Sequence, residues 1–471
     1  MGESKTAKKQ EIPSLFLQDP KYIRNLVYCK NDKTFYLYRG GWYEPLEKED
    51  LLALIRKFMM SEPSTCKMNL PFSAFKDVFE QLMLALRESK STFTEYDYDY
   101  IAFKDVMFNF RTLKAEPIDD NNRKFTPFFL NYNWAEIKNE TEINKKDPLE
   151  SLREKDKAPH FCKFLETSVV YEKDLNETDY ETIYTIQEWM GYYLGGFKKK
   201  TVALFLIGGG SNGKSVLSSI ILNMFEQKFI SANTLDEITN DSSRIASLQG
   251  KRLNFAAEDE SKKMKNDKFK ALISNDLIEA RRLWEKSFVF TPICKFLFSS
   301  QRYPQFESVD NGIRRRVRIL PMFNTFAENQ MDRSLVDKIK LEMAPIVGWA
   351  INGAMRLVEN NYCFTNSPAM LKARQRFENK MSTVMLFISE NYVKSEHSEI
   401  NGTVLYAEYE AWCKENKAHP YGKIKFFDQI DANIVKKKMD RGTTLFPLGP
   451  NKIKMEQHYA NQPNITDEVK F

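Results

Sequence analysis

The segment at 202–225, VALFLIGGGSNGKSVLSSIILNMF, constrains the fold of this chain more than any other. Its apolar run at 202–207 is typical of a buried parallel strand. A glycine-rich loop follows, and helical apolar spacing begins at Val216 and includes Ile220 and Ile221. A strand, a G-x4-G-K-S loop and a helix in this order predict a P-loop, in which backbone N–H groups and a helix N-terminus bind phosphates.

The loop supplies the candidate nucleotide-binding residues. Lys214 is expected to reach the β- and γ-phosphates, and the Ser215 hydroxyl to hold Mg²⁺. The sequence therefore predicts a site for ATP with Mg²⁺. The residues expected to form this site are Gly208, Gly209, Gly210, Ser211, Asn212, Gly213, Lys214, Ser215 and Val216.

A second short strand, in KRLNFAAEDE (251–260), ends in three acids: Glu258, Asp259 and Glu260. A carboxylate at the tip of a neighbouring strand can help to hold Mg²⁺, and a second can polarise the attacking water. We expect Glu258 and Asp259 to join Ser215 at the metal. Which of the three acids is the catalytic base stays open at this point.

A third strand pattern, CKFLFSSQRYPQF (294–306), ends near Gln301, whose amide could bond to the γ-phosphate. Three consecutive arginines, Arg314, Arg315 and Arg316, follow shortly after it. Such a triplet is often only a basic surface. In a ring ATPase, one of them would reach the neighbouring subunit's γ-phosphate as an arginine finger.

The net charge of +6 comes from 70 basic and 64 acidic residues among 471, but the basic excess is local. Segment 262–288 carries eight basic residues against four acids, with Trp284 and Lys286 near its end. Basic groups beside an aromatic side chain suit a nucleic-acid strand, whereas a solvated helix face would explain the composition equally well.

The region 421–455 has eight basic residues against three acids. Two helical patterns and a short β-wing at 443–455 suggest a winged-helix-like DNA-binding domain, the alternative being a structural cap. The lysines at 436–438 are expected to belong to the second helix. The candidate DNA-binding residues here are Lys423, Lys425, Lys436, Lys437, Lys438 and Arg441.

Other classes of protein are excluded by what the sequence lacks. The six cysteines are far apart, so neither a zinc knuckle nor a disulfide scaffold is expected. No apolar run reaches the length of a membrane span, and the N-terminus has no apolar signal segment. We therefore expect a cytoplasmic protein without a membrane partner.

Beyond the P-loop, several segments in order resemble the superfamily 3 AAA+ helicases. The chain is most similar to the poxvirus and phage/plasmid primase-helicases and to replication initiators of phage satellites and pathogenicity islands. The resemblance covers roughly 95–360. The segments that carry it are YIAFKDVMFNFRTLKAEP, QEWMGYYLGG, LISNDLIEARRLWEKSFVF, GIRRRVRILPMF and APIVGWAINGAMRL.

This resemblance implies a hexameric ATP-dependent helicase of a mobile genetic element that moves along single-stranded DNA, and an origin-binding C-terminal domain. A primase and other replication proteins are implied as further partners. By position, Lys214 and Ser215 correspond to Walker A, and the acids at 258–260 to Walker B. Lys286 corresponds to the DNA-gripping hairpin lysine, and Arg315 or Arg316 to the finger.

The sequence departs from the family at two places. Gln301 stands where the family usually has Asn, and Ser274-Asn275-Asp276 where many relatives have Gly-Gly-Asp. No primase-like acidic cluster precedes the matching region, so we expect no primer synthesis by this chain. Two alternatives are an ATP-switched initiator that does not unwind DNA and a small-molecule P-loop kinase.

The expected architecture is α/β, with an AAA+ core between two flanking domains. Residues 1–14 are expected to be a disordered tail, and 135–160 resembles a linker or solvated loop. Between 95 and 134 the aromatics are expected to be buried in a small domain. The expected parts are an α+β domain at 15–150, a helical collar at 151–200, a motor with lid helices at 201–385, and a winged-helix-like domain at 386–471.

Overall fold

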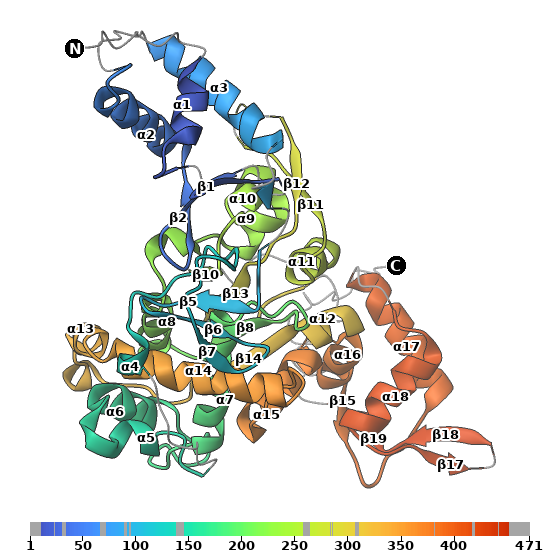
Figure 1. The fold of residues 1–471 in the computed structure, drawn as a ribbon. Coiled ribbons are helices and arrows are strands. Elements are labelled where there is room, and N and C mark those ends of the chain that lie inside the picture. Colours follow the sequence, from blue (N-terminus) through green and yellow to red (C-terminus); the bar gives the residue numbers. More distant parts are fainter. Residues whose placement is uncertain are drawn as a thin grey trace, which may run out of the picture. The chain divides into compact units, whose positions relative to one another are not determined.

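The computed structural model is shown in Figure 1. It describes residues 11–451 except 23, 31–33, 66–71, 89–91, 94–95, 138–145, 258–263, 283, 285, 307–309, 381, 417–419 and 441. The chain divides into two compact units. The first comprises Met1–Pro304 and Arg316–Leu371, and the second comprises Gln305–Arg315 and Lys372–Phe471.

The first unit begins with three helices and a four-stranded sheet of order β3-β2-β1-β4. The predicted hairpin at 33–46 is confirmed, because β2 and β3 pair antiparallel with Tyr38 opposite Tyr43. The expected tail at 1–14 is too long, since α1 begins at Ile12, whose side chain is fully buried. The elements are α1 (Ile12–Gln18), β1 (Leu26–Cys29), β2 (Thr34–Tyr38), β3 (Tyr43–Leu46), α2 (Lys48–Ser61), α3 (Phe72–Glu88) and β4 (Thr92–Phe93).

The aromatic stretch that follows forms a three-stranded antiparallel sheet of β5 (Tyr100–Ala102), β6 (Val106–Asn109) and β7 (Lys114–Pro117). Phe103, Phe108 and Phe110 are buried in a large core. Most aromatic rings of this stretch therefore contribute hydrophobic burial instead of an exposed stacking surface.

A five-stranded, fully parallel sheet forms the centre of the first unit, in the order β14-β8-β13-β10-β9. All five residues of β8 are buried, as expected for a strand covered on both faces. Helices connect the strands, which confirms the α/β class. The strands are β8 (Ala203–Ile207), β9 (Ile230–Ser231), β10 (Leu253–Ala257), β13 (Lys295–Ser300) and β14 (Val317–Pro321), and the helices among them are α8 (Lys214–Asn223), α9 (Leu235–Asn240), α10 (Ser242–Ala246) and α11 (Asn266–Ile273).

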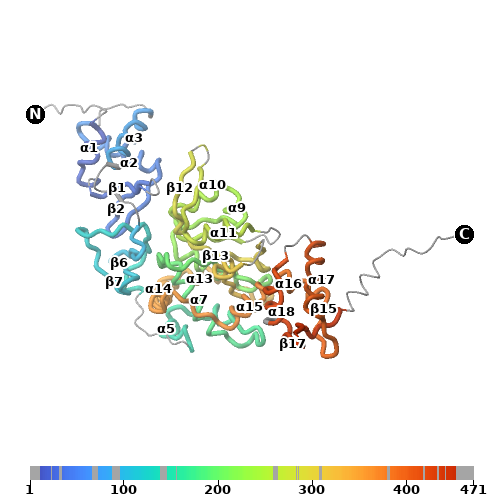
Figure 2. Tube along the Cα trace, turned by 90° about the vertical axis from the view of Figure 1, so that its right-hand side faces the viewer, coloured from blue at the N-terminus to red at the C-terminus, as the bar shows by residue number. Residues whose placement is uncertain are grey.

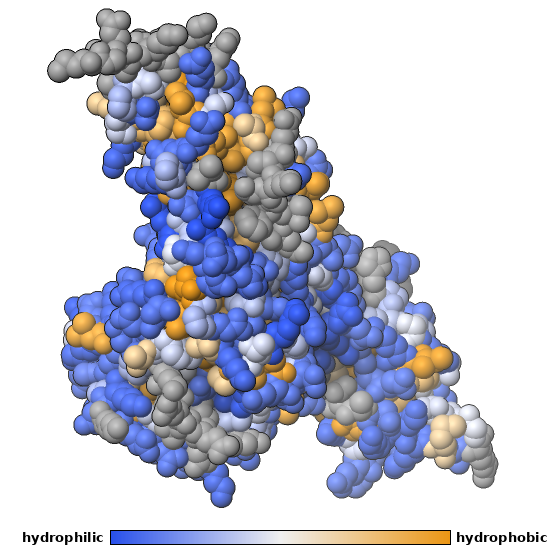
Figure 3. Space-filling model, viewed as in Figure 1, coloured by the Kyte–Doolittle hydropathy of each residue, from blue (hydrophilic) through white to orange (hydrophobic). Residues whose placement is uncertain are grey.

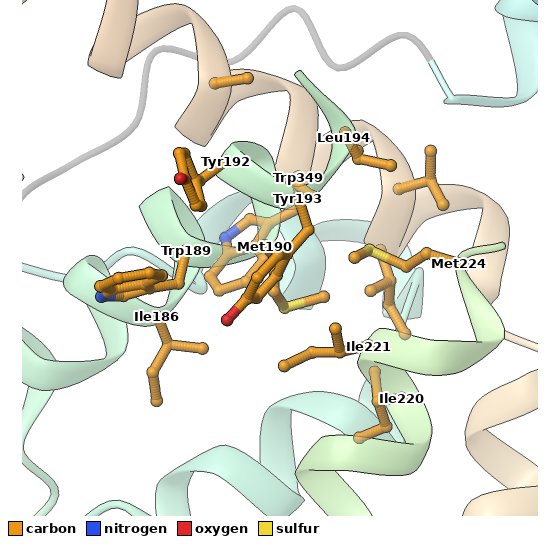
Figure 4. Packing of buried hydrophobic residues seen from close by; sticks show 14 of the residues in the cluster. Ile186, Trp189, Met190, Tyr192, Tyr193, Leu194, Ile220, Ile221, Met224 and Trp349 are labelled. Carbon is orange, nitrogen blue, oxygen red and sulfur yellow. The ribbon is translucent and has the colours of Figure 1, made fainter. Parts of the chain in front are cut away.

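Helices α7 (Tyr180–Leu194) and α14 (Met343–Glu359) pack closely against each other. A Cβ on Gly191 would lie 2.2 Å from the backbone nitrogen of Ala354, so the two backbones approach too closely for a side chain there. Figure 4 shows Trp189 and Met190 of α7 packed with Trp349 of α14 and with side chains of α8. The segment expected to be a collar and a helix expected to belong to the lid thus share one core.

The expected linker at 135–160 is wrong for its described residues. This part forms α4 (Trp134–Ile137), α5 (Glu150–Arg153) and the start of α6 (Pro159–Ser168). Leu149 and Leu152 are fully buried, and the Trp349 indole donates to the Pro148 carbonyl at 2.7 Å. A few apolar residues at the right spacing suffice to bury a segment whose composition is largely charged.

The second unit contains helices α16, α17 and α18 and two small antiparallel sheets, β15-β19 and β16-β18-β17. Leu405, Tyr409 and Phe426 lie in its core. The lysine-rich second helix was predicted too long, because α18 ends at Asn433 and Lys438 lies in β17. The elements are α16 (Thr383–Asn391), β15 (Tyr392–Lys394), β16 (Ile400–Asn401), α17 (Gly402–Glu415), α18 (Lys423–Asn433), β17 (Lys438–Asp440), β18 (Thr443–Phe446) and β19 (Leu448–Pro450).

The remaining α-helices and strands of the described residues are α12 (Asn311–Arg316), α13 (Leu335–Lys340), α15 (Pro368–Lys380) and the hairpin of β11 (Ile278–Ala280) with β12 (Phe288–Phe290). The face seen in Figure 3 is mainly hydrophilic, with hydrophobic residues in separate small groups. Among the described helices, none is long and apolar enough to cross a membrane.

Candidate functional site

The glycine-rich loop joins β8 to α8, as the sequence predicts. Gly213 precedes α8 with a φ of +86°, a conformation that glycine adopts without strain. A Cβ at this position would lie 3.0 Å from the Ser168 hydroxyl and 3.1 Å from the Phe164 ring. The loop therefore passes close to α6. Helix α8 has ten residues, and its N-terminus lies at the end of the loop. Such a helix end attracts anions.

Lys214 lies inside the loop, with only 7% of its surface exposed. Its ammonium donates to the Gly208 carbonyl at 2.6 Å, the Gly209 carbonyl at 2.7 Å and the Asn212 side-chain oxygen at 2.9 Å. The Asn212 amide in turn donates to the Met322 carbonyl, just beyond β14, at 3.2 Å. Lys214 and Asn212 thus hold the loop in shape and tie it to the end of β14.

A cavity of about 1160 Å³ opens over this loop. Its wall includes the loop from Gly209 to Val216 and Gln301, which are residues that the sequence predicted for the site. Ala257 and Ser299, at the ends of β10 and β13, also line it, and these two residues are paired across the sheet. The carboxyl edge of the parallel sheet is where ligands of such sheets bind.

The predicted acids Glu258, Asp259 and Glu260 lie outside the described residues. Ala257, the residue directly before them, lines the cavity. Among the described residues, no group of three His, Cys, Asp or Glu side chains could hold a metal ion. Of the predicted metal ligands, Ser215 alone is placed, and it lines the cavity.

The arginine triplet separates into three environments. Arg316 is 7% exposed, and its Nε donates to the Ser274 hydroxyl at 2.9 Å. Arg314 lies near Glu378 at 3.9 Å. Arg315 is exposed, and no partner of it is found within the described part of the chain. None of the three lines the cavity.

The predicted DNA-contacting segment forms α11 and the hairpin β11–β12, which lies beside α10 (Figure 2). Trp284 lies between the two strands and is 97% exposed, with a φ of +64°. Lys286 is also exposed. Asn275 lies in the segment Ser274-Asn275-Asp276, where many relatives have Gly-Gly-Asp. It adopts a φ of +57°, a conformation that a glycine would adopt more easily.

The predicted lysines of the second unit are all exposed, while Arg441 lies outside the described residues. Lys436 pairs with Asp431 at 3.7 Å, and Lys438 with Glu399 at 2.6 Å. The Lys425 ammonium lies over the Tyr421 ring at 3.9 Å. Burial and the nearby Arg314 guanidinium lower the pKa of Lys425.

Sequence reasoning missed two walls of the cavity. One is α6, which contributes His160, Lys163 and Ser168, and the other is the segment from Phe326 to Lys338. The Ser168 hydroxyl is buried, and no hydrogen-bond partner for it is found among the described residues. No motif marks these residues, because they reach the cavity only through the packing of α6 and α13.

Two buried cations were also missed, at the opposite edge of the sheet. Arg252 donates to the Tyr193 carbonyl at 3.0 Å, and the Lys295 ammonium to the Phe197 carbonyl at 2.6 Å. Burial is the main cause that lowers the pKa of Arg252 to about 9 and that of Lys295 to about 7. Both groups bind carbonyls at and just beyond the C-terminus of α7, where a helix favours positive charge.

Comparisons with known proteins identify a family model, a distant relative and similar solved structures. Residues 206–316 match a family of unknown function, DUF5906. A protein of Invertebrate iridescent virus 3, named “Putative helicase 121R”, is 22% identical over 265 residues, or 49% of this chain and 28% of that protein. The chain thus spans less than a third of that relative's length.

Solved structures of the C-terminal region of NrS-1 are also similar. The apo structure of residues 305–718 has a TM-score of 0.48 at 13% identity, covering 92% of this chain and 100% of that one. The A form apo structure has a TM-score of 0.46 at 12% identity, covering 90% and 96%. By sequence, the chain is a distant relative of a viral protein that is described as a helicase.

Proposed function

We propose that this protein is an ATP-dependent DNA helicase of the superfamily 3 AAA+ type that acts in the replication of a mobile genetic element. The observation that carries the proposal is the cavity at the carboxyl edge of the parallel sheet. The glycine-rich loop, Gln301 and the end of β10 line this one cavity. The distant similarity to a viral protein described as a helicase supports a helicase over other classes of ATPase.

In this proposal the phosphates lie on the loop backbone at the N-terminus of α8. One N–H group of the Lys214 ammonium would leave its acceptor in the loop and donate to the β- and γ-phosphates. Ser215, Glu258 and Asp259 offer the hydroxyl and carboxylate oxygens that Mg²⁺ prefers, and the ion would neutralise charge on the phosphates. One acid after β10 takes a proton from the attacking water, and the Gln301 amide bonds to the γ-phosphate.

The arginine finger is best assigned to Arg315. Arg316 is already held by Ser274 inside its own chain, whereas Arg315 is exposed and can reach a neighbouring subunit. Assembly into a hexameric ring, with the finger acting between subunits, belongs to this proposal. A guanidinium supplied in this way stabilises the charge that develops during phosphoryl transfer.

The proposed DNA contacts lie on two elements. Trp284 at the hairpin would stack on a base of single-stranded DNA, and Lys286 would bind its backbone. In the second unit, the exposed lysines at 423, 425 and 436–438 would bind origin duplex DNA, with α17, α18 and the β17–β18 hairpin as a winged-helix-like domain. The proposed domain limits are 201–385 for the motor and 386–471 for this domain.

The experiment that tests the proposal measures ATP hydrolysis and fork unwinding side by side. We expect single-stranded DNA to stimulate hydrolysis, and Lys214→Ala to abolish both activities. Lys173→Ala, an exposed lysine outside the cavity, is the matched control and keeps both. Absence of ATP hydrolysis in the wild-type protein would refute the proposal.

A second candidate function is an initiator in which ATP only switches ring assembly. Gln301 favours it, because the longer side chain changes the contact expected at the γ-phosphate. This candidate predicts ATP-driven assembly and hydrolysis without unwinding of a fork. The Gln301→Asn variant would then gain unwinding activity if side-chain length alone is responsible.

A further inference from the structure

The cavity extends well beyond the glycine-rich loop, along helix α6. Ser168, at the end of α6, lies against Gly213 of the loop. His160, near the start of the same helix, lines the same cavity. The two residues are eight positions apart, or about 12 Å along a helix at 1.5 Å per residue. A nucleotide whose phosphates lie on the loop can therefore extend its nucleoside along α6.

His160 is held in one orientation by Glu342, the residue before α14. The ring Nδ1 lies 2.6 Å from Glu342 Oε1, and the backbone nitrogens of His160 and Phe161 donate to the same carboxylate at 3.0 and 2.9 Å. The Glu342 side chain is 9% exposed and that of His160 is 46% exposed. The carboxylate thus holds the Nδ1 side of the ring, while nearly half of the His160 side chain stays exposed.

This contact fixes the hydrogen-bonding character of the ring. Nδ1 faces a carboxylate, which only accepts, so Nδ1 carries the proton. In the neutral ring, Nε2 is then an acceptor. An acceptor selects bases that present an amino group and disfavours bases that present a carbonyl at the same position.

The segment from Phe326 to Lys338, which also brings polar residues to the cavity, provides apolar groups for a base. Phe326, Met331 and Leu335 line the cavity, and all three are partly exposed. Helix α13, which carries Leu335, packs against α6. A purine ring placed on this wall would present its edge to α6.

We propose that His160 is a specificity-determining residue that accepts a hydrogen bond from the 6-amino group of adenine, with Glu342 as its positioning residue. This inference rests on the proposed ATPase function and extends it to the choice of base. ATP should bind more tightly than ITP, which has a carbonyl at position 6, and than purine riboside triphosphate, which has no substituent there. The expected preference is about three- to tenfold, the effect of one net hydrogen bond.

The test is equilibrium binding of ATP and purine riboside triphosphate to the full chain. In His160→Phe the preference for ATP should disappear, and in His160→Gln, whose amide oxygen also accepts, it should be kept. His397→Phe, an exposed histidine outside the cavity, is the matched control. If His160→Phe weakens both nucleotides equally or leaves their ratio unchanged, the inference is wrong.

Glu342→Gln gives an independent measurement. At either position the amide nitrogen would face a backbone N–H of His160 or Phe161, so the ring loses its fixed partner, and the affinity for ATP should fall relative to that for purine riboside triphosphate. An unchanged ratio would contradict the role of Glu342. Lys214→Ala distinguishes failure of the ATPase proposal from failure of this inference. If the wild type binds no triphosphate, the ATPase proposal fails. If binding depends on Lys214 but the ratio of affinities does not depend on His160, this inference alone is wrong.

Discussion

Lys214 uses all three of its ammonium donors inside its own loop. A phosphate oxygen can bind this group only by replacing one of the three acceptors. The two carbonyls belong to the backbone, so the Asn212 side chain is the partner that can most easily move away. Asn212 therefore influences both the shape of the loop and the position of the lysine.

Asn212→Ala should destabilise the protein by about 1–3 kcal/mol, because it leaves the buried Met322 carbonyl without its donor. Urea unfolding measures this loss. Asn240→Ala, which removes an exposed bond to Asp236, is the control and should change stability by less than about 0.5 kcal/mol. Equal effects in the two variants would contradict the assigned role of Asn212.

Lys295 should make the stability depend on pH. Its pKa is about 7 in the folded chain and about 10.4 in an unfolded one, so between these values the unfolded chain binds more protons. Stability conferred by this site therefore rises as pH increases from about 7, by at most about 1.4 kcal/mol per pH unit. Urea unfolding at pH 7 and pH 8.5 should show the wild type gaining stability relative to Lys295→Met. Parallel pH profiles would mean that Lys295 stays charged when folded.

Among the elements, the hairpin β11–β12 presents an aromatic ring that contributes almost nothing to the fold. Trp284 is 97% exposed, and exposed large aromatics of this kind suit a binding surface. The neighbouring strands keep it in place through three residue pairs, from Ile278 opposite Phe290 to Ala280 opposite Phe288. A change at Trp284 should therefore affect binding without affecting stability.

Trp284→Ala should weaken binding of single-stranded DNA by about 1–3 kcal/mol and leave the melting temperature unchanged. Lys286→Ala should instead weaken the salt dependence of binding. The slope of the logarithm of the binding constant against the logarithm of the salt concentration should become shallower by about 0.7. Fluorescence anisotropy over a salt series distinguishes the two. Leu277→Ala, an exposed apolar residue of the same segment, is the control. Unchanged affinity in Trp284→Ala would remove the hairpin from the proposed DNA path.

The contact between α7 and α14 should tolerate no added side chain at its closest point. Gly191→Ala places a methyl group 2.2 Å from the Ala354 backbone, and we expect a loss of about 1–3 kcal/mol or more from overpacking. Gly422→Ala, where a Cβ has open space, is the control. A near-neutral Gly191→Ala, measured by urea unfolding, would mean that the helices separate easily.

At the scale of the whole molecule, the proposed ring needs one subunit to complete the site of the next. Arg315→Ala should abolish hydrolysis without loss of stability, whereas Arg316→Ala should destabilise the chain because it removes a partly buried bond to Ser274. Mixing Arg315→Ala with Lys214→Ala should restore part of the activity, measured as ATP hydrolysis. No recovery in the mixture, with assembly intact, would argue against a finger that acts between subunits.

Local patterns were sufficient to predict the strand, loop and helix around Lys214 and the hairpin at 33–46, because each depends on neighbours in sequence. They were insufficient for the part around α5, where Leu149 and Leu152 are buried and the distant Trp349 donates to the Pro148 carbonyl. The same reason explains why His160 was missed. Its place in the cavity depends on Glu342, which lies 182 residues further along the chain.

The position of β14 would have a consequence for communication between subunits in the proposed ring. This strand pairs in register with β8, begins directly after Arg316, and ends beside the Met322 carbonyl that holds Asn212. Five residues of strand span about 17 Å and hardly stretch. Any displacement of the loop on release of its ligand would therefore reach the arginine segment within the same chain. In such a ring, the nucleotide state of one subunit would thereby affect the arginine that reaches the next subunit. Hydrolysis that proceeds around the ring from subunit to subunit requires such coupling.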